Sequence, residues 1–365
     1  MKPLSRFGRG LALLLITTVS SLHGCHGMVE AAAQPAVAAP AQAGAGTEAK
    51  LIYTGEAMGT VVQVTFWTDD EAAAAVAAEA VFTEMKRLDA VMTTWTADSE
   101  VSKVNAGAGG KPVTVSDETF RVIARAQDVA IKSRGVFDIT VGAYKGLWRF
   151  DEDIDGQLPN MKDVRARKKL VNYRDLVLNV KNKTVQLRRK GMSITLGGIA
   201  KGYAVDQCVA LLRNRGFVDF IVQAGGDMYV SGKKTTQPWV VGIRDPRGPR
   251  ESSFAIAPIE DHSFSTSGDY ERAFIKDGKR YHHILDPRTA QPATKSRSVT
   301  IRAHDAFTAD AWSKVLFIQG WQAALKLAAT LPDFEVVIVD DQNQVHISKG
   351  LQADVKLLKQ PSPGV

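Results

Sequence analysis

The sequence has few cysteines, the residues that form disulfides and bind structural zinc. It holds only two cysteines, Cys25 and Cys208, in 365 residues. Cys25 ends a segment with the features of a leader, so the mature chain has no second internal thiol to pair with Cys208. The sequence also lacks zinc-ligand spacing and any motif that reads DNA or RNA. We therefore exclude a disulfide scaffold, a zinc domain and a nucleic-acid partner.

The overall composition is that of an ordinary globular protein, with 45% hydrophobic and 23% charged residues. The length suits one large domain or two closely packed ones. The formal net charge is +7, but the basic residues are dispersed along the chain. We interpret most of them as solvated surface charges, with attraction to an anionic small molecule or a membrane surface as the weaker alternative.

The N-terminal segment has the pattern of a signal peptide. Three basic residues precede an apolar run over residues 11–19, which is too short to span a bilayer. The sequence Leu-His-Gly-Cys at 22–25 resembles the lipobox of bacterial lipoproteins, in which Cys25 is lipidated and becomes the new N-terminus. We expect a leader over 1–25; the alternative is an ordinary signal peptide that is cleaved later.

Three further regions follow the leader. Residues 26–50 are rich in Ala, Pro, Gln and Gly, which predicts a flexible tether. The folded domain is expected over 51–358, and residues 359–365 are expected to form a loose tail. This organisation predicts a domain held by a lipid anchor on the periplasmic face of a membrane in a bacterial cell envelope.

The stretch 194–206 carries the first pattern that indicates a binding site in the folded part of the chain. A strand pattern runs into a glycine turn, after which apolar residues recur at helical spacing. Gly197, Gly198 and Gly202 carry no Cβ, so a ligand can touch the backbone, and Lys201 adds a positive charge. The pattern favours a site for an anionic group such as a phosphate. Alone, it fits a tight turn for strand–helix packing equally well.

Helices and strands alternate without a regular βαβ rhythm, and no Gly-x-Gly-x-x-Gly follows a strand. We therefore expect an α+β fold and not a Rossmann fold. Residues 135–142 are expected to form a strand or loop edge, and 148–161 an exposed loop. The remaining predicted helices are 71–92, a short helix that ends at 105, 116–133, and a helix that starts at about 306. The predicted strands are 61–66, 184–187, 220–224, 239–243, 299–301 and 335–339.

Eight motifs occur in an order that resembles the ApbE family, the FAD:protein FMN transferases, and the resemblance spans about residues 53–320. They are Ala-Met-Gly-Thr at 57–60, Asp-Ser-Glu at 98–100, Gly-Val-Phe-Asp-Ile-Thr-Val-Gly at 135–142, Gly-Gly-Ile-Ala-Lys-Gly-Tyr at 197–203, Gly-Gly-Asp at 225–227, Ser-Thr-Ser-Gly-Asp-Tyr at 265–270, His-Ile-Leu-Asp-Pro-Arg-Thr at 283–289 and Ala-Asp at 309–310. One glycine motif is weak, but eight in order make a chance similarity improbable.

The resemblance implies a fold and a reaction. The fold is a mixed-sheet, T-fold-like α+β body that binds FAD in a cleft between lobes. The reaction is a magnesium-dependent transfer of FMN from FAD to a Thr or Ser hydroxyl of a target flavoprotein, with release of AMP. Acceptors in such a family include subunits of membrane redox complexes. The alternatives are a FAD-binding or FAD-hydrolysing relative without transfer, and a non-catalytic flavin-binding lipoprotein.

The resemblance also implies a magnesium site. Its ligands would be the Asp310 carboxylate and the main-chain carbonyl of Gly198, although Asp310 also suits the N-cap of a helix. Position 314 is usually Thr in the family and is Lys314 here, with Ser313 beside it. Either Lys314 swings out and Ser313 or water substitutes, or metal use is altered; we predict weakened metal affinity.

Eight positions match the cofactor site of the family by resemblance: Met58 against the flavin, Trp95 on a FAD ring, and Val136, Phe137, Asp138, Thr195, Lys201 and Leu285 along the FAD site. Thr195 stands where many relatives have an acidic residue. Five of them have a structural alternative: core packing for Met58 and Leu285, ordinary packing for Trp95, a turn cap for Asp138 and a solvated charge for Lys201.

His283 and Asp310 are the predicted catalytic residues. The unperturbed pKa of a histidine suits a general base that takes the proton of the acceptor hydroxyl near neutrality. His282 is adjacent, and neighbouring residues of a strand face opposite ways, so at most one of the two is expected in the site. A histidine held by structural hydrogen bonds is the alternative.

Overall fold

The computed structural model of the chain describes residues 48–150 and 154–365. The predicted leader 1–25, its lipidation site Cys25 and most of the predicted tether 26–50 lie outside these residues. Regular structure begins at Ala49, two residues before the predicted start of the domain. None of the helices in the described ranges is long and apolar enough to cross a membrane.

The main sheet has eight strands, and each neighbouring pair is antiparallel. It contains the strands predicted near 61–66, 220–224, 299–301 and 335–339. In spatial order the strands are β1 (Ala49–Ala57), β2 (Thr60–Thr68), β6 (Phe220–Ala224), β7 (Asp227–Ser231), β11 (His262–Gly268), β16 (Ser296–Ala303), β17 (Phe334–Asp340) and β18 (Val345–Ile347).

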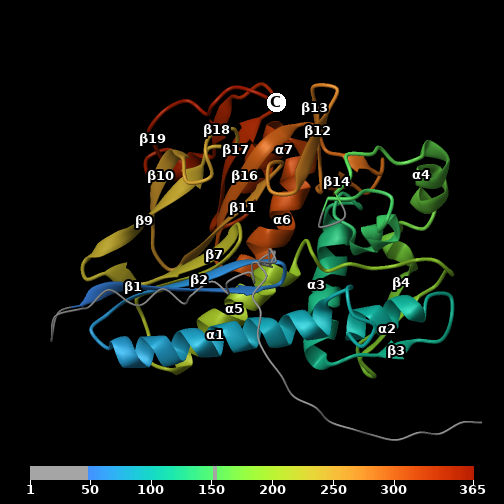
Figure 1. Cartoon of the computed structure of the whole chain (residues 1–365), viewed down its shortest axis with the longest axis horizontal. Helices are drawn as coiled ribbons and strands as arrows, with labels where there is room; N and C mark the ends of the chain where they lie inside the picture. Colours follow the sequence, from blue (N-terminus) through green and yellow to red (C-terminus); the bar gives the residue numbers. More distant parts are fainter. Residues whose placement is uncertain (1–47, 151–153) are drawn as a thin grey trace, which may run out of the picture. The chain divides into compact units, whose positions relative to one another are not determined.

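Helices cover one face of this sheet (Figure 1). They are α1 (Glu71–Met92), α5 (Ala200–Asn214), α6 (Ala306–Gln319) and α7 (Trp321–Ala328). Met85 and Leu88 of α1 are fully buried with Phe66 and Phe220 of the sheet and Phe317 of α6. Burying each such side chain contributes roughly 1.5–3 kcal/mol, so this face carries the largest hydrophobic core.

A smaller sheet covers the opposite face. Its strands are β19 (Lys356–Leu357), β10 (Ser253–Ile259), β9 (Gln237–Arg244) and β8 (Lys233–Lys234). In β17, Val336 and Ile338 belong to the core under the helices, whereas Val337 and Val339 belong to the core under the small sheet. Adjacent residues of a strand point to opposite faces, so one strand serves both layers.

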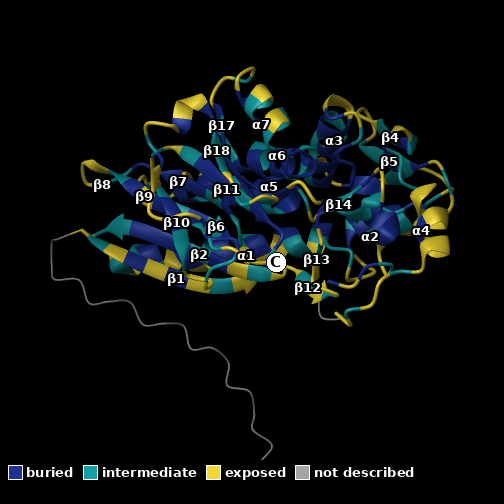
Figure 2. Cartoon of the chain, turned by 90° about the horizontal axis from the view of Figure 1, so that it is seen from above, coloured by how far each residue is buried: buried dark blue, intermediate teal, exposed yellow. Residues whose placement is uncertain are grey.

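Residues 99–199 form an additional set of elements that joins the main core. Ser99 and Ser116 cap α2 and α3. The α4 helix is almost entirely exposed (Figure 2). The elements are α2 (Glu100–Ala106), β3 (Val113–Thr114), α3 (Asp117–Lys132), η1 (Ile139–Tyr144), α4 (Met161–Lys168), η2 (Tyr173–Asp175), β4 (Leu176–Asn179) and β5 (Thr184–Leu187).

Short hairpins and one turn of 3-10 helix complete the described fold. They are β12 (Ala273–Lys276), β13 (Lys279–His282), β14 (Leu285–Asp286), β15 (Gln291–Pro292) and η3 (Lys349–Leu351). Helices and antiparallel sheets are thus combined in one α+β fold, which confirms the predicted class.

Two local predictions were wrong in part, because 135–142 runs into a 3-10 helix and 148–161 is a largely exposed loop only from residue 154 to 160. Within 135–142, the chain enters the 3-10 helix η1 because Asp138 accepts a hydrogen bond from the Thr140 backbone N–H at 2.8 Å and so caps it. In the predicted exposed loop 148–161, Trp148 and Phe150 are buried, with ring centroids 5.6 Å apart. Aromatic burial overrides the polar composition around them.

The C-terminal residues are held and are not loose. Asp245 is fully buried, so its carboxylate needs donors. Lys359 Nζ lies 2.7 Å from its Oδ2, and the Ser362 backbone N–H donates to its Oδ1 at 3.0 Å. The Asn343 side chain also donates to the Pro361 carbonyl at 2.7 Å. The composition of 359–365 gave no sign of these long-range partners.

Candidate active site

The glycine turn and α6 meet at one place. The backbone N–H of Gly202 donates to Asp310 Oδ2 at 2.9 Å, across 108 positions of sequence. A Cβ on Gly202 would lie 2.2 Å from the Ala306 carbonyl oxygen, which no side chain tolerates. Asp206 adds a second link, because its carboxylate accepts from the backbone N–H groups of Ala306 and Phe307 at 2.9 Å each. Packing and hydrogen bonds therefore fix the two helix starts against each other.

Four charged side chains, Lys201, Asp227, Asp310 and Lys314, form what we call the charge cluster. Lys201 Nζ lies 2.7 Å from Asp227 Oδ2, and Lys314 Nζ contacts Asp310 Oδ1. The carboxylates are 3% and 0% exposed, whereas Lys201 and Lys314 keep 23% and 16% of their side-chain surface. The formal charges cancel, and the ammonium groups occupy the more accessible side.

The protonation states follow from burial and pairing. Burial would raise the pKa of Asp310, but the ammonium groups of Lys201 and Lys314 and the Gly202 N–H outweigh it and lower this pKa. Burial would likewise lower the pKa of Lys201, but Asp227 and Asp310 raise it. Burial and the Asp310 charge raise the pKa of Asp227, whereas its contact with Lys201 favours the carboxylate. The contacts Lys201–Asp227 and Lys314–Asp310 thus pair each buried carboxylate with one lysine.

Gly198 and Asp310, which hold the predicted magnesium ligands, both lie close to Lys314. The ideal Cβ position of Gly198 lies 3.3 Å from the Phe137 ring and 4.0 Å from Lys314 Cγ, so the turn faces the same side of α6. Asp310 lies inside α6, whose N-cap is Asp305, so the alternative N-cap role of Asp310 is wrong. These contacts make Gly198, Asp310 and Lys314 neighbours in space.

The residues at this position do not fit a divalent cation. Oδ2 of Asp310 already accepts from Gly202 N–H, and Oδ1 is covered by the Lys314 ammonium. Two unit charges 4 Å apart repel by about 4 kcal/mol at an effective dielectric constant of 20, and a divalent ion doubles this. In residues 48–150 and 154–365, no three His, Cys, Asp or Glu side chains gather into a metal site.

The first outcome expected for Lys314, a side chain that swings out, is not the one in the structure. The Lys314 side chain points inward to Asp310. Ser313 does not substitute for the family Thr, because its buried hydroxyl donates to the Asp310 carbonyl and pairs with Ser267 Oγ, both at 2.7 Å.

His283 borders the charge cluster on its open side. Its backbone N–H donates to the Arg272 carbonyl at 3.1 Å, and the residue is exposed. Although part of the residue reaches the surface, desolvation by the groups packed around its ring, then the charges of His282, Arg272, Lys314 and Lys201, lower the pKa of His283 to about 3. His282 is buried, and its Nε2 pairs with the Ala293 carbonyl at 2.8 Å. Only His283 is therefore available to a ligand.

The turn that holds Met58 reaches the same region. Met58 and Gly59 have φ values of 55° and 67° and join β1 to β2 in a two-residue hairpin turn. The Arg272 guanidinium donates to the Gly59 carbonyl at 3.2 Å, and Asp89 accepts from the Met58 backbone N–H at 3.0 Å. Arg272 thus links the Met58 turn to His283.

The other predicted cofactor residues divide into two groups. Val136 and Phe137 are buried, and the Phe137 ring lies beside the glycine turn. The Thr195 hydroxyl accepts from the Gly197 N–H at 3.4 Å within that turn. By contrast, the carboxylate oxygens of Asp138 accept hydrogen bonds from Thr140 and Tyr173. Leu285 packs beside Tyr144, Val164 and Ala290. For these two, the structural alternative describes the contacts present.

The Trp95 ring contacts Lys145, which is not part of the charge cluster. Its side chain is 69% exposed, and Lys145 Nζ sits 4.6 Å from the ring centroid while donating to the Thr94 carbonyl at 2.7 Å. An exposed indole of this kind offers one open face for stacking.

Comparison with known proteins now places the chain in a family. The sequence model described as the ApbE family matches residues 58–338, which includes the glycine turn, the charge cluster and His283. The chain belongs to the ApbE family.

Curated relatives and solved structures agree with this membership. The chain is 31% identical to a FAD:protein FMN transferase of Klebsiella pneumoniae, covering 81% of this chain and 91% of that one. It is 32% identical to one of Treponema pallidum, covering 82% and 87%. The ApbE protein of Thermotoga maritima superposes with a TM-score of 0.76 at 33% identity, and the flavin transferase ApbE of Vibrio cholerae with 0.74 at 25%; each alignment covers 84% of this chain and 99% of the other.

Two residues of this candidate site were missed from the sequence. Asp227 was recognised only as part of the Gly-Gly-Asp motif, which signals a tight turn between β6 and β7; a Cβ on Gly226 would lie 2.3 Å from the Thr266 carbonyl oxygen. Arg272 follows the Ser-Thr-Ser-Gly-Asp-Tyr motif and carried no signal of its own. Both act through partners distant in sequence.

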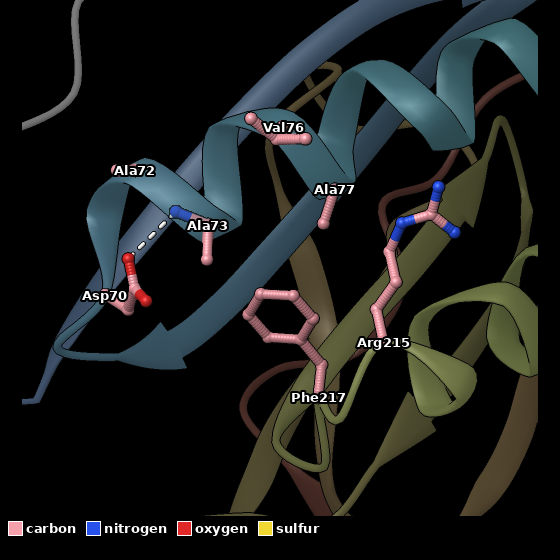
Figure 3. Close-up of a pocket in the computed structure, with 7 residues that line it drawn as sticks. All are labelled: Asp70, Ala72, Ala73, Val76, Ala77, Arg215 and Phe217. Atoms are coloured by element: carbon pink, nitrogen blue, oxygen red, sulfur yellow. Dashed lines mark hydrogen bonds between the residues drawn. The ribbon is translucent and has the colours of Figure 1, made fainter.

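A pocket elsewhere on this ApbE-family fold has no such chemistry. It has a volume of about 530 Å³ and lies between the start of α1 and Arg215 and Phe217 after α5 (Figure 3). Its one carboxylate, Asp70, caps α1 by accepting from the Ala73 N–H at 2.8 Å. Arg215 is 13 residues beyond Gly202, so at 1.5 Å per residue the pocket is roughly 20 Å from the charge cluster.

Proposed function

We propose that this chain is a FAD:protein FMN transferase. One observation carries the proposal: in a member of the ApbE family, the glycine turn and Asp310 are joined by the Gly202 N–H bond beside two ammonium groups. Backbone N–H groups and fixed cations are what a diphosphate requires. The relatives from Klebsiella pneumoniae and Treponema pallidum, which bear this activity in their names, support the assignment.

The proposed reaction transfers a phosphoryl group. The hydroxyl oxygen of an acceptor Thr or Ser attacks the phosphorus of the FMN half of FAD and forms a phosphoester. The P–O bond to the bridging oxygen breaks, and AMP leaves with that oxygen and the electron pair. The hydroxyl proton is released to a base or to solvent. Such chemistry needs positioning and charge neutralisation more than a protein nucleophile.

The chain's own residues supply these needs. The Lys201 and Lys314 ammonium groups face the accessible side of the cluster and would contact the diphosphate. Met58 would lie against the flavin, and the open face of Trp95 would stack on a ring of FAD. His283 lies beside the charge cluster and would accept the hydroxyl proton once the bound diphosphate offsets the cations that lower its pKa. The magnesium ion that the resemblance implies has no place in this assignment.

The location and partners are part of the proposal. Lipidation at Cys25 and a tether over 26–50 would hold the domain on the periplasmic face of a bacterial membrane. Acceptor hydroxyls there belong to flavoproteins such as subunits of membrane redox complexes.

Incubation of the purified chain with FAD and an acceptor flavoprotein domain tests the function, with products separated by mass spectrometry. We expect the acceptor to gain the mass of FMN through its Thr or Ser, with one AMP released for each FMN attached. Release of AMP and FMN without a conjugate would instead indicate a FAD-hydrolysing relative. Bound but unchanged FAD would indicate a non-catalytic flavin-binding lipoprotein.

A further inference from the structure

The Lys314 side chain presents a cation at the position where the resemblance implies a metal. It lies one helical turn after Asp310 on α6, and its ammonium group contacts Asp310 Oδ1. Its Cγ lies 4.0 Å from the ideal Cβ position of Gly198, the other implied ligand. The Lys314 side chain thus passes the glycine turn with its methylene stem and contacts the carboxylate with its ammonium group.

The charge balance of the cluster is complete without an added ion. Lys201 neutralises Asp227, and Lys314 neutralises Asp310. With a neutral Thr at position 314, the same cluster would carry one negative charge and leave Oδ1 of Asp310 open to a cation. Lys314 neutralises that negative charge and covers Oδ1 of Asp310.

The accessible side of the cluster is cationic. Lys314 keeps 16% of its side-chain surface and Lys201 keeps 23%, while both carboxylates are buried. The exposed His283 feels the positive charges of Arg272, Lys314 and Lys201. A ligand that enters from this side meets ammonium groups first, which suits a diphosphate.

We propose that the Lys314 ammonium replaces the divalent cation, so that it neutralises the FAD diphosphate and lets FMN transfer proceed without a metal ion. This inference rests on the proposed transferase function. In the reaction, Lys314 stays protonated and bonded to Asp310 and offers its remaining N–H donors to the diphosphate oxygens. The leaving AMP carries the bridging oxygen and the electron pair of the broken P–O bond, and Lys314 stabilises that charge.

The activity test uses the full-length chain, FAD and an acceptor flavoprotein domain, with excess EDTA or with added magnesium. We expect the rate of flavin attachment in EDTA to equal that in magnesium within about threefold. Lys314→Thr should lose about 100-fold in EDTA, the usual cost of removing one electrostatic stabiliser, and regain activity when magnesium is added. Lys326→Thr removes an exposed lysine of α7 and should change neither rate.

A direct binding test does not depend on turnover. Electron paramagnetic resonance of Mn²⁺ with FAD should show no protein-bound ion in the wild-type chain and a bound ion in Lys314→Thr. A wild-type protein that binds Mn²⁺ at or below about 100 µM, or transfers flavin only with magnesium, overturns the inference. So does Lys314→Thr with full activity in EDTA. If no flavin reaches the acceptor under any condition, the transferase proposal fails, and the Mn²⁺ spectra still decide the role of Lys314.

Discussion

At the scale of single residues, the charge cluster contains two ion pairs, Lys201–Asp227 and Lys314–Asp310, whose carboxylates differ in how well they are hydrogen-bonded. Burying charges costs several kcal/mol for each ion, and pairing repays this only when geometry and hydrogen bonds are good. Asp310 meets that condition through Gly202 and Lys314, and Asp227 meets it in part, since its Oδ1 is buried without a hydrogen-bond partner. The cluster is therefore sensitive to the loss of any one member.

We predict that Asp310→Ala lowers the free energy of unfolding by about 3–5 kcal/mol, because it leaves two ammonium groups facing one carboxylate. Denaturant titration measures this. Asp128→Ala is a matched control, since Asp128 and Lys132 are also spaced i,i+4 but are 40% and 58% exposed. There we expect a loss of only about 0.3–0.5 kcal/mol. Equal losses in both variants would mean that burial of the cluster contributes nothing.

The lowered pKa of His283 gives a second prediction. Its folded-state pKa of about 3 lies below the ordinary value of 6.5, so between these values the unfolded chain is protonated and the folded one is not. Acidification below 6.5 therefore favours unfolding, and the imidazole stays neutral in the folded protein. We expect kcat/KM for FAD to show no histidine titration from pH 8 down to about 5.

A pH–rate profile of the wild type, with His283→Ala as its control, checks this. His283→Ala should turn over more slowly at saturating FAD and keep the same flat profile. An acid limb near pH 6.5 that disappears in His283→Ala would show that the histidine titrates normally, and an unchanged turnover number in that variant would exclude it as the base.

At the scale of elements, the start of α5 depends on glycines for two different reasons. Gly202 lies against α6, where a Cβ would be 2.2 Å from the Ala306 carbonyl oxygen. Gly197 is exposed, and a Cβ there would meet only Thr195 Oγ1, at an ordinary 3.6 Å. The first glycine serves helix packing, and we assign the second to close approach of the ligand.

We predict that Gly202→Ala destabilises the protein by about 1–3 kcal/mol or more through overpacking, whereas Gly197→Ala leaves the unfolding midpoint unchanged. If the turn cradles the diphosphate, Gly197→Ala weakens FAD binding by about tenfold. Thermal unfolding and fluorescence titration with FAD separate the two effects. A Gly197→Ala protein with unaltered FAD affinity would place the diphosphate elsewhere.

At the scale of the whole molecule, none of the helices in the described residues is long and apolar enough to cross a membrane. The proposed membrane attachment is through a lipid at Cys25, which lies outside the described residues. The other cysteine, Cys208, is buried on α5 with its thiol 3.8 Å from the Val81 carbonyl, so it is unavailable for such a modification.

We predict that the full-length chain, expressed in a bacterium with lipoprotein processing, partitions into the membrane fraction and the detergent phase. Cys25→Ala should move it to the aqueous phase because one acyl chain contributes about 0.8 kcal/mol per buried CH₂. Cys208→Ala should leave the partition unchanged. A Cys25→Ala protein that stays with the membrane would contradict lipidation at this position.

The sequence alone determined the local structure and the family. Ser99 and Ser116 cap their helices, and the predicted strands near 61–66 and 220–224 belong to the main sheet, because caps and hydrophobic periodicity act over a few residues. The eight ordered motifs indicated the ApbE family, which the family model and the fold confirm.

Only the tertiary structure decided how the charges pair. The sequence left Lys314 with two possible directions and Asp310 with two roles, and it gave Asp227 no partner. Their states depend on contacts across 108 positions between Gly202 and Asp310 and on the exclusion of water from both carboxylates. Coulomb interactions strengthen as the local dielectric constant falls, and that constant is a property of the packed interior and not of the order of residues.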